Sequence, residues 1–552
     1  MKWQLVRENQ NLPLLEQLLA NRGLTDQKKI EQFLNPHISD LTDPKDIPGL
    51  VKAAERVLLA KKNNEKVVVF GDYDVDGVTA TSIMVETLKF LGINTSYHIP
   101  HRHQEGYGLS IPAIEKLAQG GAQLIITVDC GISNLAEIAR AKQLGLDVIV
   151  TDHHNLPAKL PQACAIVNPK IIQGDHPAKE LAGAGVAFKF AWGLLRVAGN
   201  RDSKFLLSLL DLAALGTLAD VVPLHAENRI LAVLGMRVIN ERRRAGIVAL
   251  ADVASLADHI TVSNIYFAIA PRINAAGRLD HARQAAELLL TQDPSQAKKL
   301  AVELNEINVK RRSIGDEIRE AVFEQINDTY LAANKVVVLS GDDWHPGVIG
   351  ITASKVVDSC ARPAVLVGVV DGEGRGSARS IEGVNIFEIL SSCADLFSRF
   401  GGHKGAAGFS IAQENIPILK ERLAEVARLE ISDEALMPKL MIDAEIKPTQ
   451  LNLNLVKQLE KLEPYGQDNP QPIFMSSGLK IMDMKKVGKT GSHFKAKFCN
   501  NDVILDTIAF SKGNWADELS YDKRYDLAYR LEANEWNGFE NVQLSLVDVR
   551  ES

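Results

Sequence analysis

The sequence has few cysteines and no long apolar run. Its five cysteines are scattered over 552 residues without a CxxC pair, which argues against a disulfide framework and against a cysteine-based zinc cluster. No apolar stretch approaches the about 20 residues of a membrane helix, and the first residues lack the apolar core and small-residue cleavage site of a secretion signal. We therefore expect a cytoplasmic protein with reduced thiols and no membrane partner.

An excess of positive charge and a dinucleotide-binding motif are also missing. The net charge of −7 argues against a chain whose whole surface grips duplex DNA, although a local basic channel is compatible with it. No GxGxxG follows the first predicted strand, Val67–Phe70, which counts against a dinucleotide-binding oxidoreductase.

The length and the order of apolar segments predict several domains. At about 150 residues per domain, the chain has room for three or four. Strands and helices alternate from Val51 onwards, with strands at Val67–Phe70, Leu124–Val128 and Val148–Thr151, and this pattern indicates an α/β unit with a largely parallel sheet covered on both faces. We expect a leader packed on the first domain, the α/β unit, a helical connector, a second α/β unit and a small β-barrel, at residues 1–50, 51–227, 228–330, 331–435 and 436–552.

Acidic side chains and two histidines follow the predicted strands of the first α/β unit. They are Asp72, Asp74 and Asp76 after the first strand, Asp129 after Leu124–Val128, Asp152-His153-His154 after Val148–Thr151, and Asp220 after the apolar stretch Leu212–Leu218. In open α/β sheets the ligand site lies outside the carboxyl ends of the strands, so these groups can converge on one crevice.

Asp74 and Asp76, which are one residue apart, predict a bound cation. Two unit charges about 4 Å apart repel by roughly 4 kcal/mol at an effective dielectric near 20. No Lys or Arg occurs between Lys66 and Lys89, so the balancing charge comes from elsewhere in the fold or from a cation. An Asp after a strand often only caps the next helix, which is an open explanation for Asp72 and Asp129. Caps do not require two adjacent histidines, and oxygen ligands suit Mg²⁺ or Mn²⁺.

We interpret the set as a two-metal centre for phosphoryl chemistry. The expected ligands are Asp74, Asp76, Asp129, His153 and Asp220. His154 could contact the scissile phosphate or help to protonate the leaving oxygen, because imidazole titrates near pH 6.5.

Two other segments have both a nucleic-acid interpretation and an ordinary one. Lysines alternate with aromatic residues in the predicted hairpin Lys485–Phe498, which suits a single strand but equally describes an exposed hairpin with Phe in the core. Lys310, Arg311 and Arg312 could touch phosphates, although a solvated helix face is the more common explanation.

The motifs GDYDVDG, TVDCGIS, DHH and ALGTLADVVPL, at residues 71–77, 127–133, 152–154 and 214–224, resemble the DHH phosphoesterase superfamily. Further segments resemble its RecJ family. They are EGYGLS, LAGAGVAFK, PRINAAGRL, WHPGVIGI, GSARS and GGHKGAAG, at residues 105–110, 181–189, 271–279, 344–351, 376–380 and 401–408. The resemblance extends from about residue 50 to the end of the chain.

The resemblance implies a single-stranded-DNA-specific exonuclease of recombination and repair that releases mononucleotides from the 5′ end with Mn²⁺ or Mg²⁺. It implies a DHH domain, a DHH-associated nucleic-acid-binding domain and an OB-fold for the barrel. It carries the five metal ligands onto the positions named above, and we assign catalysis to Asp72, Asp76, His153 and His154. The expected macromolecular partners are single-stranded DNA, a single-strand-binding protein and a helicase.

The resemblance also suggests residues that bind the substrate. They are Arg102, Arg278, Ser377, Arg379, His403, Lys486 and Lys489. Arginine forks suit a terminal phosphate because their donors match its oxygens. For Arg272 and Arg278, ion pairing with Asp280 or Glu287 is the structural alternative.

Two other functions stay open. A DHH hydrolase of short oligonucleotides or other small phosphates would use the same metals, but it would not need the extra C-terminal module. A non-catalytic nucleic-acid-binding scaffold would not need the intact acids.

Overall fold

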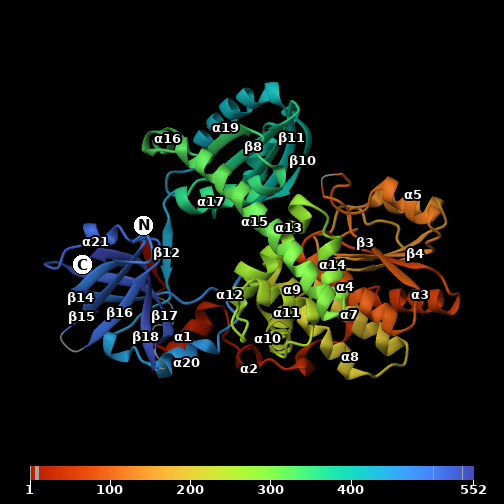
Figure 1. The fold of residues 1–552 in the computed structure, drawn as a ribbon, viewed down its shortest axis with the longest axis horizontal. Helices are drawn as coiled ribbons and strands as arrows, with labels where there is room; N and C mark the ends of the chain where they lie inside the picture. Colours follow the sequence, from red (N-terminus) through yellow and green to blue (C-terminus); the bar gives the residue numbers. More distant parts are fainter. Residues whose placement is uncertain (1, 7–10, 103, 501–502, 537–538) are drawn as a thin grey trace.

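A parallel sheet forms the centre of the N-terminal half of the chain (Figure 1). The computed structural model describes residues 2–6, 11–102, 104–500, 503–536 and 539–552. The strands lie in the order β3 (Thr95–His98), β2 (Val67–Phe70), β4 (Leu124–Val128), β5 (Asp147–Thr151) and β6 (Ala165–Val167), all parallel. Phe70 pairs with Thr127 and Val128 with Thr151, so β2, β4 and β5 end at nearly the same level.

Helices cover both faces of this sheet, as its apolar strands require. Val67, Val69 and Ile126 face one core, and Val68, Phe70 and Ile125 face the other. The first face is covered by α3 (Leu50–Lys62), α4 (Val75–Phe90), α7 (Gly183–Val197) and α9 (Leu210–Ala219), and the second by α5 (Ile111–Gln119) and α6 (Leu135–Gln143). The predicted α/β unit is confirmed.

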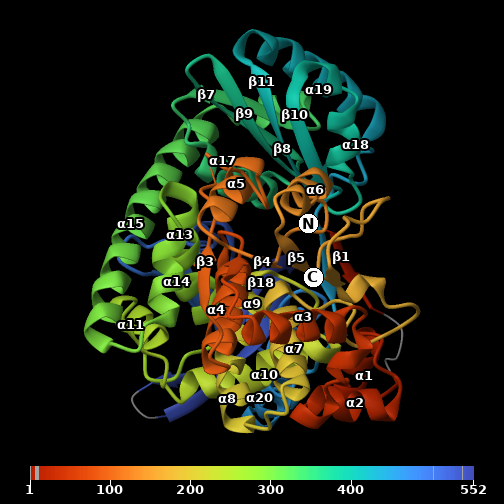
Figure 2. The same ribbon diagram turned by 90° about the vertical axis from the view of Figure 1, so that its right-hand side faces the viewer.

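The next segment is helical, as the sequence predicts. Its elements, with the short α8 that precedes α9, are α8 (Ser203–Ser208), α10 (Ala226–Asn240), α11 (Ala245–Val253), α12 (Val262–Asn264), the π-helical turn η4 (Ile265–Ile269), α13 (Ala270–Leu279), α14 (Arg283–Leu290) and α15 (Pro294–Glu324). These helices share one hydrophobic core with the first sheet, up to Leu304 in α15. Further along α15, Ile318 and Val322 pack against the second sheet, so this one helix joins both units (Figure 2).

The second α/β unit has a mixed sheet. Its strands lie in the order β10 (Phe397–His403), β11 (Ala406–Ala412), β9 (Glu373–Arg379), β8 (Ala364–Val370) and β7 (Val337–Asp342). Only β7 and β8 are parallel. The helices of this unit are α16 (Asp328–Ala333), α17 (Pro346–Cys360), α18 (Ile386–Ser391) and α19 (Ile416–Glu430). α17 packs on one face, and α18 and α19 pack on the other.

The C-terminal region is a closed five-stranded barrel. It consists of β14 (Phe474–Val487), β15 (His493–Cys499), β16 (Ile504–Ala509), β18 (Phe539–Glu551) and β17 (Arg524–Trp536), and pairing between β14 and β17 closes it. β13 (Ala444–Glu445), α20 (Leu453–Glu460) and α21 (Trp515–Glu518) accompany the barrel. Five strands that close into a small barrel are the architecture of an OB-fold.

The leader does not pack where we expected. α1 (Leu14–Asn21) and α2 (Gln27–Leu34) insert Leu18, Leu19 and Phe33 into the core of the barrel, and β1 (Lys2–Leu5) pairs with β12 (Lys439–Ile442). Only the following residues, among them Leu41, join the core of the first domain. The expectation of a leader packed on the first domain is therefore wrong for residues 14–34, because apolar side chains of α1 and α2 complete the core of the barrel instead.

A buried arginine fastens the barrel to the first domain. Arg229 in α10 is 2% exposed, and its guanidinium donates to the carbonyls of Phe33, Lys461, Leu462 and Glu463 at 2.6–3.1 Å. It also lies 3.6 Å from the centroid of the Phe33 ring. In the described part of the chain, no helix is long and apolar enough to cross a bilayer.

Replacing Arg229 should loosen this joint. We expect Arg229→Met to destabilise the fold by at least about 3 kcal/mol, because several buried carbonyls lose a charged donor. The measurements are the thermal unfolding midpoint and the rate of tryptic cleavage between α2 and the barrel. Arg237→Ala, at an exposed position of the same helix, is the control. Equal midpoints for the two variants would show that Arg229 does not hold the joint.

Candidate metal centre

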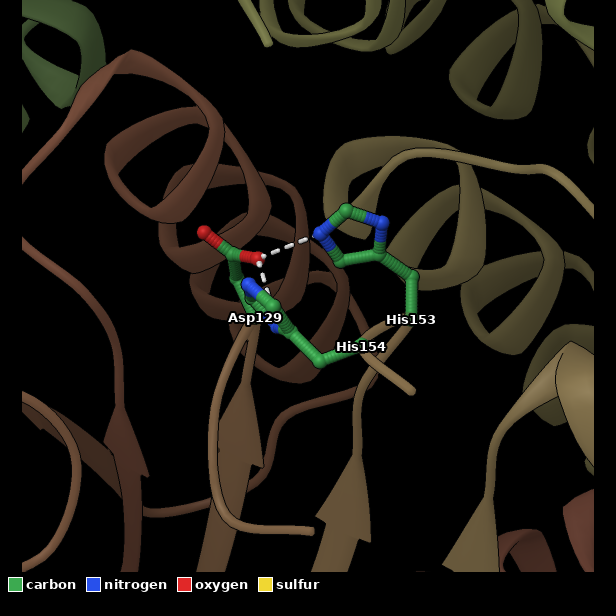
Figure 3. A group of neighbouring side chains, drawn as sticks. All are labelled: Asp129, His153 and His154. Atoms are coloured by element: carbon green, nitrogen blue, oxygen red, sulfur yellow. Dashed lines mark ion pairs between the residues drawn. The ribbon is translucent and has the colours of Figure 1, made fainter. Parts of the chain in front are cut away.

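Carboxylates and imidazoles from four segments meet above the carboxyl ends of β2, β4 and β5. The His153 Nε2 atom lies 3.1 Å from Asp129 Oδ1, 3.6 Å from Asp220 Oδ2 and 3.9 Å from Asp76 Oδ2. Figure 3 shows both imidazoles, from the loop after β5, turned towards the Asp129 carboxylate at the end of β4. Three overlapping groups have ligand atoms within 4.8 Å of one another: Asp129 with His153 and His154, Asp76 with His153 and Asp220, and Asp72 with Asp74 and Asp129.

Helix starts fix the first two aspartates. α4 begins at Val75, because the Asp74 side chain accepts a hydrogen bond from the Gly77 amide at 3.0 Å and caps the helix. Asp76 then lies in the first turn and is 1% exposed. Its two oxygens accept from the Gly183 and Ala184 amides at 2.6 and 2.8 Å, at the start of α7, where the helix dipole favours negative charge.

Two glycines allow the ligands to come this close. A Cβ at Gly183 would lie 2.7 Å from Asp129 Cβ and 2.8 Å from Asp76 Oδ2. A Cβ at Gly216 in α9 would lie 2.7 Å from Asp76 Oδ1. The backbone also bends beside the ligands, because Asp129 and Val221 have φ values of 60° and 58°, a region that non-glycine residues seldom adopt. Packing therefore imposes the arrangement of the ligands.

The central acids have no recorded ion pair with a lysine or arginine in the described structure. The recorded ion pairs of Asp76, Asp129 and Asp220 are with the two histidines alone. Burial and then Asp74 raise the pKa of Asp76 to about 7, and burial followed by Asp76, Asp74 and Asp72 raises the pKa of Asp220 to about 9. Burial lowers the pKa of His153 to about 3, so its imidazole is neutral and able to ligate a metal.

The donor set fits divalent metal. The Oδ1 atoms of Asp72 and Asp129 are buried and have no hydrogen-bond partner in the described structure. Such acceptors are costly unless a positive group satisfies them. Carboxylate oxygens with one or two imidazoles match Mn²⁺ or Mg²⁺ better than soft metals.

A cavity of about 370 Å³ opens onto the centre. Its acidic and imidazole lining consists of Asp72, Asp74, Asp129, His154 and Asp220, and its other lining residues include Arg102, Arg278, Tyr73, Tyr107 and Asn274. The Arg102 guanidinium lies over the Tyr73 ring, 5.0 Å from its centroid. The cavity thus contains arginine side chains as well as the acidic centre.

Known proteins match this chain over its whole length. The DHH family, N-terminal domain, matches residues 66–217, the DHHA1 domain matches 333–429, and the RecJ OB domain matches 442–548. The single-stranded-DNA-specific exonuclease RecJ of Haemophilus influenzae is 37% identical over 98% of this chain and 96% of its own length. The chain belongs to the RecJ family. RecJ of Bacillus subtilis is 37% identical over 100% of this chain and 71% of its own length.

A solved RecJ structure has the same fold. RecJ of Thermus thermophilus in complex with Mn²⁺ superposes with a TM-score of 0.84 at 30% identity, covering 100% of this chain and 80% of that one. The predicted family and the predicted domain types are therefore confirmed, including the OB-fold.

The predicted substrate residues are spread more widely than the metal ligands. Arg102 and Arg278 line the metal cavity. Arg379 Nη1 donates to Ser377 Oγ at 3.1 Å on β9, and a Cβ at Gly350 would lie 2.9 Å from both side chains, so α17 packs directly on this pair. His403 lies at the exposed end of β10.

Lys486 and Lys489 lie on the barrel, where Lys489 is exposed. Lys486 pairs with Asp517 at 2.5 Å, so part of its charge is already balanced. The ion-pair alternative for Arg272 is wrong: it donates to Asn305 Oδ1 and to the Ala268 carbonyl, while Glu287 pairs with Arg283.

Three residues around the RecJ-type centre escaped prediction as site residues. Asp152 Oδ1 accepts from the amides of His153 and His154 and lies 2.8 Å from His154 Nδ1. The Tyr107 hydroxyl donates to the Asp129 carbonyl at 3.0 Å and lies 3.2 Å from the same His154 nitrogen. Asn274 accepts from the Val75 amide at 3.1 Å. The motifs DHH, EGYGLS and PRINAAGRL contain these three residues, but nothing in the motifs assigned them to the site.

The raised pKa values predict an unusual pH dependence. In the folded protein the pKa values of Asp76 and Asp220 exceed the value near 4 of a carboxyl in the unfolded chain. These carboxyls therefore stabilise the fold at low pH. This contribution is lost as the pH rises through about 7 for Asp76 and about 9 for Asp220. Without divalent metal the thermal midpoint should fall between about pH 5 and about pH 9, and Mn²⁺ should raise it more at about pH 9 than at about pH 6.

Asp220→Asn should raise the metal-free midpoint at high pH and weaken the response to Mn²⁺. Asp358→Asn, at an exposed position of α17, is the control and should leave both unchanged. A Mn²⁺ response of the same size at every pH would contradict the assignment.

Proposed function

We propose that this chain is a single-stranded-DNA-specific exonuclease that releases mononucleotides from the 5′ end by phosphodiester hydrolysis. One observation carries the polarity: the cavity that holds the metal-type ligands also contains Arg102 and Arg278. Arginine side chains suit a terminal phosphate, and the acidic centre suits an adjacent scissile phosphate.

The metal ligands in this proposal are Asp74, Asp76, Asp129, His153 and Asp220, with Asp72 beside them. Mn²⁺ or Mg²⁺ bound there would neutralise phosphate charge and lower the pKa of an attacking water. The neutral His153 imidazole and the amide-held Asp76 carboxylate keep the ligand atoms in place before any metal arrives.

His154 is placed to act on the substrate. Its Nδ1 atom faces Asp152 and Tyr107, which leaves Nε2 for the cavity that the ring lines. Although burial acts in the opposite direction, the Asp152 carboxylate raises the pKa of His154, which favours the protonated ring. In the proposal this ring donates a hydrogen bond to the scissile phosphate or a proton to the leaving oxygen.

Arg102, Arg278 and Arg379 form the proposed pocket for the 5′ phosphate. Burial and the guanidinium groups of Arg102, Arg311 and Arg379 lower the pKa of Arg278 to about 10. Such crowding of like charges is unfavourable without an anion, and a terminal phosphate with its charge of nearly two would relieve it. Ser377, which accepts from Arg379, completes the pocket.

The remaining contacts follow from a long single strand. His403 and the exposed Lys489 would touch the phosphate backbone away from the centre, with Lys486 in a weaker role because of Asp517. A cytoplasmic enzyme of this specificity needs its duplex opened first, so a helicase and a single-strand-binding protein are its expected partners in recombination and repair.

The deciding experiment is digestion of 5′-phosphorylated, 3′-labelled single-stranded DNA and of the matching blunt duplex with Mn²⁺. We expect stepwise shortening from the 5′ end of the single strand, and much slower attack on a 5′-hydroxyl strand because the arginine pocket loses its anion. Turnover of dinucleotides or pyrophosphate without attack on the polymer would replace the proposal with a small-phosphate hydrolase.

Removing a ligand should separate binding from cleavage. We expect Asp76→Ala and His153→Ala to lose at least about 100-fold in rate, since even the partners of metal ligands are worth 10- to 100-fold. Binding of single-stranded DNA should largely survive, as measured by fluorescence anisotropy. Loss of binding as severe as the loss of cleavage would contradict these roles.

A further inference from the structure

A second and larger cavity lies beside the metal cavity. Its volume is about 930 Å³, and the two cavities share Ala219, Asn274 and Arg278 as a common wall. Residues of α13, α15 and α17, together with the loop Gly466–Pro470 that leads to the barrel, also line it. A strand that ends in the metal cavity can therefore continue into this space.

An exposed aromatic ring lines this cavity. Phe267 is 81% exposed, although Ile265 and Ile269 in the same turn are fully buried. Pro271 has no N–H to donate to the Phe267 carbonyl, and the Ala270 amide instead bonds the Ile265 carbonyl, which gives the π-helical turn η4. The backbone thus holds Phe267 on the outside of a rigid helix.

The neighbouring residues hold this wall in place. The Tyr266 hydroxyl donates to the Tyr465 carbonyl at 3.4 Å, and its ring meets the Phe267 ring edge-on with centroids 6.4 Å apart. A Cβ at Gly466 would lie 2.6 Å from the Tyr266 hydroxyl oxygen, so the loop from the barrel packs closely on η4. Phe267 is therefore presented on a fixed support.

Arg311 supplies positive charge to the same cavity. Its Nη2 atom donates to Asn308 Oδ1 at 2.9 Å, while its Nε atom has no hydrogen-bond partner among the described residues. No carboxylate of the described structure forms a recorded ion pair with it. Glu382 and Asp468 also line the cavity, so phosphate is favoured only on the side of Arg278 and Arg311.

We propose that this cavity holds the nucleotide on the 3′ side of the scissile bond, with its base stacked on Phe267 and the next phosphate, on the 3′ side of this nucleotide, on Arg311. The inference rests on the proposed function and names the residues that place the strand across the metal centre. Stacking on an aromatic ring accepts every base, which suits an enzyme without sequence preference. Phe267 is a positioning residue: it holds the strand so that the next phosphodiester lies at the centre.

An isolated exposed apolar side chain needs no function by itself, and Leu429 at the end of α19 is 79% exposed. Phe267 differs because it lines a concave space that also contains arginine and adjoins the metal centre. Leu429→Ala is therefore the matched control for Phe267→Ala.

The test is a double-mutant cycle on binding, which combines removal of the Phe267 ring with removal of one base of the strand. The probe is a 5′-phosphorylated, 3′-labelled oligonucleotide with a single abasic site placed in turn at each of the first nucleotides, bound without divalent metal and measured by anisotropy. We expect Phe267→Ala to weaken binding of the intact strand by about tenfold. We expect an abasic site at the second nucleotide to weaken binding to the unchanged protein by a similar factor and to have little further effect in Phe267→Ala.

In Phe267→Trp an abasic site at the second nucleotide should again weaken binding, as in the unchanged protein. Leu429→Ala should behave as the unchanged protein. Arg311→Gln should weaken binding of intact and abasic strands equally and reduce the salt dependence. The inference is overturned if an abasic site at each position weakens binding by the same factor in the unchanged protein and in Phe267→Ala. That result would leave this face to a protein partner.

This experiment measures binding alone, so its result can be separated from the result of the digestion experiment that tests the proposed function. Failure of the unchanged protein to shorten single-stranded DNA would defeat that function, whereas normal digestion together with an unchanged abasic penalty in Phe267→Ala would defeat only this inference.

Discussion

The repulsion among the buried carboxylates at the ends of β2 and β4 is the constraint on which the rest of the site depends. Asp72, Asp76 and Asp129 are 4%, 1% and 2% exposed, and no recorded ion pair of the described structure joins them to a lysine or arginine. The fold tolerates this charge because the amides at the start of α7 hold Asp76, and because Gly183 and Gly216 let the helices approach. A divalent cation balances the negative charge that these amides balance only in part.

Positive charge lines the same space. Arg102 and Arg278 share a cavity with the acidic centre, while Arg311 lines the adjoining one. This arrangement suits a substrate that carries one phosphate at its end and another at each following nucleotide. Because α13 and α15 belong to the core of the first domain and α15 also packs on the second sheet, the arginines and the acids sit on one continuous framework. The proposed function and the proposed base contact both draw on that framework.

The barrel is tied to this framework from two directions. α1 and α2 complete its core, and Arg229 in α10 donates to the carbonyl of Phe33 in α2 and to those of Leu462 and Glu463, which precede the barrel strands. The loop that follows these carbonyls, Gly466–Pro470, lines the cavity beside the metal centre. The barrel is therefore connected to the space beside the metal centre through this loop, which suits the proposed action on a long polymer.

The sequence by itself predicted the parallel sheet, the helical segment after it and the barrel, and it marked the acids and histidines that the fold brings together at one centre. Apolar runs of strand length followed by acids are local signals, four motifs in order indicate the DHH superfamily, and further segments indicate the RecJ family. The tertiary structure alone decided that α1 and α2 pack on the barrel, that Asp152 and Tyr107 hold His154, and that Phe267 faces a cavity beside the centre. These facts depend on contacts between residues far apart in the chain, and neither spacing nor composition records which surfaces meet.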